Sequence, residues 1–321
     1  MEGSLLRLEW WVKWVIVLLV ALGLVYISVA STAFAGKPTQ GAYTFQRTKS
    51  PAGTRVLDST GKWVASFTDG SRTVALRGPT RIFSEATTPY SVTHSTWIRL
   101  LSEPFTGTVD QGWLTQSLAD PSLDVLGVAM QYVAGAPDVL DNGLRIAGDA
   151  SFGPLLADGT RQEGSDFNDY LGVSWDYPST TDHPELDQLG SLDCSGFMRM
   201  VWGYRSGLPL ALEPNGLELP RRAVQMHASA PGVIVIRNTG TQVVDLAKLQ
   251  IGDLVFFDAA TDDGTAIDHV GMFLGVDSGG HHRFISSRKS IDGPTLGDYA
   301  GRSTLNGTGL YAKAFRATRR L

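Results

Sequence analysis

Cysteine is scarce in this chain, because Cys194 is the single one among 321 residues. A disulfide framework within the chain is therefore excluded, although exported proteins commonly acquire their cysteines in pairs. An unpaired thiol is either an inert, buried side chain or a reactive group, and its neighbours decide between the two.

An excess of positive charge is also lacking. The formal net charge is -5, and the 27 Lys and Arg residues are scattered rather than gathered into one run. This distribution excludes the electrostatic surface that nucleic-acid binding requires. Asp262-Asp263-Gly264 resembles the start of a calcium loop but lacks the later ligands, so we predict no metal site.

Disorder is excluded as well, since 43% of the residues are hydrophobic and only 18% are charged. A chain of this length can fill the cores of two domains.

The N-terminal 36 residues contain the long apolar run of the chain. Residues 14–35 are uncharged and follow Arg7 and Lys13, which predicts a transmembrane anchor or signal peptide over residues 1–36 with the rest of the chain exported. Ala33-Phe34-Ala35 fits a signal-peptide cleavage site. Anchored and secreted forms both remain open.

Two further regions precede the cysteine. Residues 37–54 are rich in Thr, Gly, Lys and Pro and are predicted to be a linker. Residues 55–108 contain short β-type runs separated by Gly-containing turns, which predicts a small β-rich domain of unknown role. Its single histidine, His94, is interpreted as a surface or packing residue.

A second domain, of α+β class, is predicted over residues 120–321. Apolar residues recur at helical spacing over 124–134 and 193–206, and residues 137–192 are irregular, as binding loops often are. Short apolar runs then predict an antiparallel sheet with strands at 233–236, 254–257, 270–274, 283–285 and 312–317.

Cys194 falls in the first turn of its predicted helix, and His269 begins a predicted strand. A helix N-terminus or a neighbouring imidazolium lowers the pKa of a thiol from about 8.5 into the range of roughly 3.5–7.5. Free N–H groups of the first helical turn can also hold an oxyanion. The two residues therefore form a candidate Cys–His pair for acyl transfer.

Five sequence blocks make the interpretation more specific. They are Leu192-Asp193-Cys194-Ser195-Gly196-Phe197, Gly207-Leu208-Pro209-Leu210, Leu219-Pro220-Arg221-Arg222 with Gln225, Gly252-Asp253-Leu254-Val255-Phe256-Phe257, and Asp268-His269-Val270-Gly271-Met272-Phe273-Leu274-Gly275. In this order they resemble the NlpC family of papain-like bacterial cell-wall cysteine peptidases, over roughly residues 124–321.

The resemblance implies a papain-like domain, with the nucleophile on a helix N-terminus packed on an antiparallel sheet. Cys194 would attack the carbonyl, His269 would take and return the proton, and Asp193 and Ser195 would border the substrate cleft. The implied substrates are peptidoglycan stem peptides, cut between D-glutamate and a diamino acid. Neither a metal nor an organic cofactor is implied.

This sequence departs from the family pattern at the residue that orients the base, which is often His. Phe284-Ile285 is followed here by Ser286, whose hydroxyl can accept the imidazole N–H but carries no charge. His282 is the alternative, because alternation along a strand gives it the same face. We expect Ser286 to take this role.

Two features of the irregular stretch stay open. Phe152 stands where the family tends to have a Tyr near the oxyanion, so that role is unassigned. Asp149, Asp166, Asn168 and Asp169 form either a specificity wall over the cleft or, as we expect, a solvated acidic loop.

Two other functions compete with the peptidase. A non-catalytic wall-binding or scaffold protein would keep the fold with an unreactive thiol. An acyltransferase or amidase would use the same pair on another amide or ester, since a fold does not fix the acceptor.

Overall fold

The structure is a computed structural model that describes residues 43–260, 264–297 and 303–321. The predicted anchor or signal segment and the first part of the predicted linker lie outside the described residues. Among the helices that the structure describes, none has the length and apolarity needed to cross a bilayer.

The first sheet has five antiparallel strands in sequence order. They are β1 (Thr44–Lys49), β2 (Ala52–Leu57), β3 (Trp63–Thr68), β4 (Thr73–Ser84) and β5 (Ser91–Leu100). Strands occupy the region predicted to be β-rich, and β1 and the start of β2 also occupy the predicted linker from Thr44 onward, so that part is not a linker. Threonine, which contributed to the linker interpretation, also favours strands.

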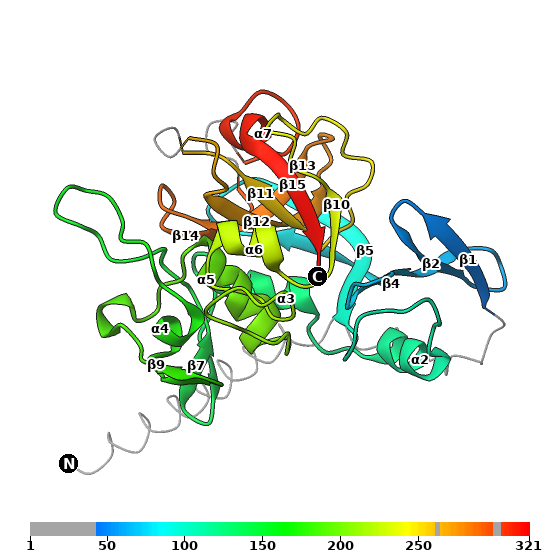
Figure 1. The fold of residues 1–321 in the computed structure, drawn as a ribbon, viewed down its shortest axis with the longest axis horizontal. Helices are drawn as coiled ribbons and strands as arrows, with labels where there is room; N and C mark the ends of the chain where they lie inside the picture. Colours follow the sequence, from blue (N-terminus) through cyan, green and yellow to red (C-terminus); the bar gives the residue numbers. More distant parts are fainter. Residues whose placement is uncertain (1–42, 261–263, 298–302) are drawn as a thin grey trace, which may run out of the picture. The chain divides into compact units, whose positions relative to one another are not determined.

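The second sheet has six antiparallel strands in the order β10-β15-β11-β12-β13-β14. They are β10 (Val233–Ile236), β15 (Phe315–Arg320), β11 (Leu254–Phe257), β12 (His269–Val276), β13 (His282–Arg288) and β14 (Gly293–Thr295). Figure 1 shows α5 (Cys194–Met198) and α6 (Ala223–Ser229) beneath this sheet and α7 (Leu310–Ala314) above it. The mixed α+β class with antiparallel sheets is confirmed. Residues 312–314, predicted as strand, are helical.

Both faces of the second sheet are covered. Leu254 and Phe256 of β11 belong to the core on the side of α5, whereas Val255 and Phe257 belong to a second core on the side of α7. Successive side chains of a strand point to opposite faces. The uninterrupted apolar run Leu254–Phe257 follows from this double burial.

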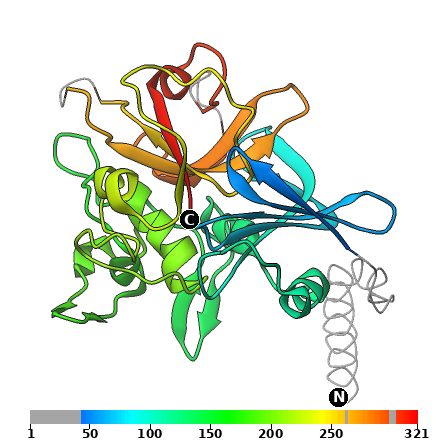
Figure 2. The same cartoon turned by 45° about the vertical axis from the view of Figure 1, so that its right-hand side comes forward.

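The two sheets share one core, so residues 42–321 form one compact unit rather than two separate domains. Ala75, Phe83, Val92 and Ile98 of the first sheet are buried in the same cluster as α5 and β12 residues. In Figure 2, strands of the first sheet run beside the second sheet. The sequence shows both sets of strands but not that their apolar faces meet.

Polar contacts also connect the two sheets. Arg81 of β4 makes a two-pronged ion pair with Asp124 at 2.7 and 2.9 Å, and Asp124 also accepts the Ile98 N–H at 2.7 Å. His94 Nε2 lies 3.1 Å from the carbonyl oxygen of Leu274 in β12. His94 is thus a packing residue that connects the two sheets.

The helices are shorter than the sequence patterns. Residues 124–134 contain α3 (Val125–Ala129) and the 3-10 helix η2 (Met130–Tyr132), and 193–206 contain α5, which continues as the π-helix η4 (Arg199–Tyr204). A further helix, α2 (Gln111–Ala119), was not predicted. The stretch 137–192 holds β6 (Val139–Asp141), β7 (Leu144–Ala147), α4 (Phe167–Leu171), β8 (Trp175–Tyr177), β9 (Thr180–Asp182) and η3 (Leu186–Gln188).

Candidate active site

Cys194 is the first residue of α5, which packs on β12 and β13. Its Sγ lies 4.0 Å from the carbonyl oxygen of Asp268, and the Val270 N–H donates a hydrogen bond to the sulfur. These two backbone groups belong to the residues on either side of His269. The structure therefore brings the thiol to the start of the strand that carries His269.

Gly196 allows the first turn of α5 to lie against another segment. A Cβ at this position would be 2.1 Å from the Ser165 carbonyl oxygen and 2.9 Å from Asp166 Cα. The Asp193 N–H also donates to the Ser165 carbonyl oxygen at 2.9 Å. The glycine in the Asp-Cys-Ser-Gly block is thus required by the close approach of residues 165–166.

His269 is buried, and its Nε2 lies 3.1 Å from Ser286 Oγ. Its ring packs against Phe257 and Tyr311, with centroids 5.7 and 5.2 Å away. Of the two candidate partners, the structure brings Ser286 to His269. His282 instead pairs with Val276 at the opposite end of β12.

Asp193 and Ser195, which the resemblance places at the cleft, are mostly buried in a polar network. Asp193 Oδ1 accepts the N–H of Gly196 at 2.7 Å and the hydroxyl of Ser195 at 3.0 Å, so that Asp193 caps α5. Arg221 donates to Asp193 Oδ2 and to Ser195 Oγ, each at 2.8 Å. Burial opposes ionisation of Asp193, but Arg221 and the capping bonds hold the pKa of this carboxyl below its usual value.

Arg221 lies in this network, and the sequence analysis gave it no role, although it stands in one of the five blocks. Its Nη2 also donates to the Gly164 carbonyl oxygen at 2.6 Å. Burial opposes the charge, but Asp193 and Asp166 raise the pKa of Arg221 above its ordinary value. Arg221 thus contacts two carboxylates beside the first turn of α5. The one signal for it in the sequence was the adjacent pair Arg221-Arg222.

From the sequence, the helix N-terminus was expected to lower the pKa of the Cys194 thiol, but in the structure this pKa is raised. Burial and the Asp193 carboxylate raise the pKa of Cys194 to about 12, against the Val270 N–H and the Arg221 charge, which lower it. Burial and the Arg288 charge lower the pKa of His269 to about 3. The helix N-terminus does not lower the pKa of the thiol here, because burial and, after it, the charge of the capping residue Asp193 raise it. Both groups are neutral near pH 7.

Of the four residues considered for a wall or a solvated acidic loop, Asp149 is exposed, whereas Asp166, Asn168 and Asp169 are buried and form neither. Asp166 forms an ion pair with buried Arg199 at 2.9 Å and lies 3.4 Å from Arg221. Asn168 and Asp169 are buried in α4, and burial raises the pKa of Asp169 to about 7. Acidic residues were expected at the surface because burial of an ionised group usually costs too much.

The segment 161–164 crosses to the turn between β13 and β14. Arg161 forms an ion pair with Asp292 at 2.8 Å, and Glu163 with Lys289 at 2.6 Å. Phe152, the position without an assigned role, is buried and donates its N–H to Asp292 at 3.0 Å. These contacts hold the segment beside the N-terminus of α5.

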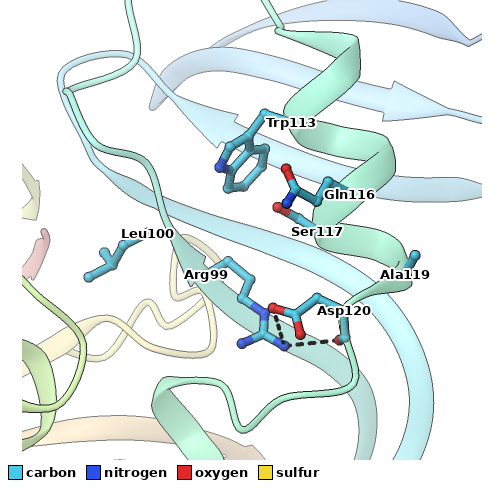
Figure 3. A pocket seen from close by; sticks show the side chains of 7 residues that line it. All are labelled: Arg99, Leu100, Trp113, Gln116, Ser117, Ala119 and Asp120. Atoms are coloured by element: carbon cyan, nitrogen blue, oxygen red, sulfur yellow. Dashed lines mark hydrogen bonds and ion pairs between the residues drawn. The ribbon is translucent and has the colours of Figure 1, made fainter.

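Elsewhere, a pocket lies between α2 and β5 (Figure 3). It is lined by Arg99, Leu100, Trp113, Gln116, Ser117, Ala119 and Asp120, none of which is a predicted site residue. Arg99 donates a hydrogen bond there to the Asp120 carbonyl oxygen at 3.0 Å, as Figure 3 shows. In the described parts of the chain, no three His, Cys, Asp or Glu side chains gather as a metal site would require.

Comparisons with known proteins find similarity to one family model and to solved structures. No curated protein matches the chain. A solved structure titled as similar to lipoprotein, NLP/P60 family, from Staphylococcus aureus subsp. aureus Mu50 is 20% identical, covering 68% of this chain and 51% of that one, with a TM-score of 0.28. NlpC1 from Trichomonas vaginalis is 14% identical, covering 88% and 90%, also with a TM-score of 0.28. This chain thus spans about half the length of the staphylococcal protein.

The family model described as the NlpC/P60 family matches residues 174–306. The matched segment contains α5, β12 and β13, and with them Asp193, Cys194, Ser195, His269 and Ser286. This part of the chain is therefore similar to the NlpC/P60 family.

Proposed function

We propose that the protein is a cysteine peptidase that hydrolyses peptide bonds in the stem peptides of peptidoglycan. Cys194 is the nucleophile, His269 the general base, and Ser286 the residue that orients the base. The observation that carries the proposal is the position of the Cys194 sulfur, against the backbone groups that flank His269, with Ser286 3.1 Å from His269 Nε2.

The contact with Ser286 also assigns roles to the two ring nitrogens. If Nε2 carries the proton and donates it to Ser286 Oγ, then Nδ1 has the free lone pair that can accept the thiol proton. The sulfur then attacks the carbonyl carbon, and the electron pair of the C=O bond moves to the oxygen. N–H groups of the first turn of α5, which have no intrahelical acceptor, can stabilise this oxyanion.

His269 next donates its proton to the leaving amine, which gives a thioester on Cys194. Water, deprotonated by His269, then hydrolyses the thioester and restores the thiol. None of these steps requires a metal or an organic cofactor.

The substrate bond we propose lies between D-glutamate and a diamino acid, on the family resemblance of the five blocks. We also propose that the protein is exported, either anchored by residues 1–36 and facing the wall or secreted after cleavage. Arg7 and Lys13, which precede the uncharged apolar residues 14–35, support this location.

Digestion of purified peptidoglycan by the full chain tests the proposal. Mass spectrometry should find fragments that gain one water with a new amino group on the diamino acid. Cys194→Ala should abolish the products, while Thr115→Ala at a partly exposed position of α2 should leave them unchanged. Intact peptidoglycan after prolonged incubation with the wild type would refute the peptidase.

A second candidate is a wall-binding protein that does not cleave. It is favoured by the neutral thiol, whose pKa is raised to about 12. Sedimentation with insoluble peptidoglycan, equal for wild type and Cys194→Ala and without released fragments, would support binding alone. An acyltransferase or amidase would instead release products joined to an added amine, or split another amide or ester.

A further inference from the structure

Arg288, at the end of β13, lies directly behind Ser286 and is 3% exposed. Its Nε donates to Ser286 Oγ at 2.8 Å, and its Nη1 donates to the Gly297 carbonyl oxygen at 3.2 Å and to Ser303 Oγ. The guanidinium also stacks over the rings of Phe284 and Tyr311, 4.6 and 4.9 Å from their centroids. These contacts fix both the position and the orientation of the cation.

Arg288 places a permanent positive charge one hydroxyl group away from the imidazole, since a guanidinium does not lose its proton in proteins. Among the residues that the structure describes, the other titratable groups near His269 are Asp193, which caps α5, Cys194 of α5 and Tyr311 of α7. Asp268 adjoins it, and its carboxylate accepts the N–H groups of Ala259 and Ala260 at 2.6 and 2.8 Å. A cation at this point disfavours a second cation on the ring.

We propose that Arg288 is a positioning residue that, through Ser286, holds His269 as a neutral imidazole in the resting protein. The resting pair is then a thiol and a neutral base, and the proton leaves the sulfur only as the carbon–sulfur bond forms. The inference deepens the proposed function and rests on it for the roles of Cys194 and His269.

The hydrogen-bond chemistry of Ser286 supports this arrangement. Arg288 Nε–H can only donate, so it occupies one lone pair of Ser286 Oγ, and the second lone pair can accept the His269 Nε2–H. This tautomer leaves Nδ1 unprotonated for the thiol. A carboxylate in the place of Arg288 would instead stabilise imidazolium and favour a preformed ion pair.

The electrostatic balance agrees with the geometry. Burial contributes most and Arg288 next to lowering the pKa of His269 to about 3, while Asp193 opposes them. Removal of the Arg288 charge should therefore make the imidazole easier to protonate, although burial would still hold its pKa low.

The test is a pH titration of the full chain by NMR, with 15N-labelled histidine and the His269 signal assigned by its absence from His269→Asn. In the wild type, His269 should remain neutral from pH 8 to pH 4.5. In Arg288→Gln its midpoint should rise by about one pH unit or more. Arg288→Lys, which keeps the charge, should restore the wild-type curve.

Arg283→Gln provides the matched control, because Arg283 is also buried on β13 but pairs with Asp277 at 2.7 Å. It should leave the His269 titration unchanged even if it lowers the melting temperature. Circular dichroism of each variant checks folding. If Arg288→Gln does not fold, Arg288→Met, which removes the charge but keeps an apolar chain against Phe284 and Tyr311, takes its place in the titration.

The proposal is overturned if wild-type His269 titrates near the ordinary value of about 6.5, or if Arg288→Gln and wild type titrate alike. The readout requires no substrate. A protein that fails to cleave peptidoglycan but shows the expected titrations would refute the proposed function and leave the role of Arg288 standing.

Discussion

At the scale of single residues, the environment of Cys194 makes its reactivity depend steeply on pH. Because the pKa of the thiol is raised to about 12, iodoacetamide should label it slowly at pH 6 and about tenfold faster with each pH unit up to pH 9. His269→Ala should change this profile little, since no imidazolium assists the resting thiol. Rapid labelling at pH 6 that slows in His269→Ala would instead establish a preformed ion pair.

Asp193 is the charged residue whose removal should activate the thiol. Asp193→Asn keeps a capping oxygen for α5 but removes the anion that raises the pKa of Cys194, so labelling at pH 8 should accelerate by about three- to tenfold. The loss of the partner of Arg221 should lower the free energy of unfolding by about 1–3 kcal/mol. Asp187→Asn, an exposed carboxylate on η3, is the control, and equal labelling of the two variants would contradict this assignment.

At the scale of elements, the contact between α5 and residues 165–166 depends on Gly196. Gly196→Ala would place a Cβ 2.1 Å from a backbone oxygen, so we expect a loss of at least about 2 kcal/mol in unfolding free energy, as for other overpacked sites. Gly112→Ala is a matched control in the first turn of α2, where the nearest contact is the Asp110 side chain at 3.2 Å.

Urea unfolding of both variants measures the difference. The alanine at position 112 should change little or gain up to about 1 kcal/mol from helix propensity. Equal unfolding free energies for Gly196→Ala and Gly112→Ala would show that residues 165–166 do not pack closely against Gly196.

At the scale of the whole molecule, the shared core predicts that residues 120–321 do not fold alone. That fragment lacks β4 and β5, and it would expose the apolar residues that pack on Ile98 and Val92. It also loses the partner of Asp124 and the hydrogen bond from Thr73 N–H to the Leu321 carbonyl oxygen at 2.8 Å. Circular dichroism should show no cooperative thermal transition for it, whereas residues 43–321 should melt cooperatively.

Stability towards acid also belongs to this scale. The pKa of His269 is lowered to about 3, so between pH 6.5 and 3 the unfolded chain binds the proton that the folded protein excludes. The contribution of His269 to stability is therefore lost as pH falls through this window. The melting temperature of His269→Asn should decline less from pH 7 to pH 4.5 than that of the wild type, and parallel declines would contradict the buried neutral imidazole.

The local pattern of this sequence determined most of its strands, the helix with Cys194 at its start, and the blocks that resemble the NlpC family. These features depend on alternation, helical spacing and short motifs, all of which act between residues close in the chain. The same patterns left the candidate site incomplete. Arg221 and Arg288 had no predicted role, and Asp166 and Asp169 were expected in a solvated loop, because a charged residue shows its burial only through a partner distant in sequence.

The tertiary structure alone decided three matters: the choice of Ser286 over His282, the joining of two predicted domains into one unit, and the charge state of the reactive pair. The register of β12 and β13 selects the serine, since His282 pairs with the far end of β12. The common core exists because strands β4 and β5 bury their apolar side chains against those of α5 and β12. Without these two strands, those side chains of α5 and β12 would be exposed. The thiol and imidazole are neutral because burial and charges from other elements outweigh the helix N-terminus, and no local pattern records that balance.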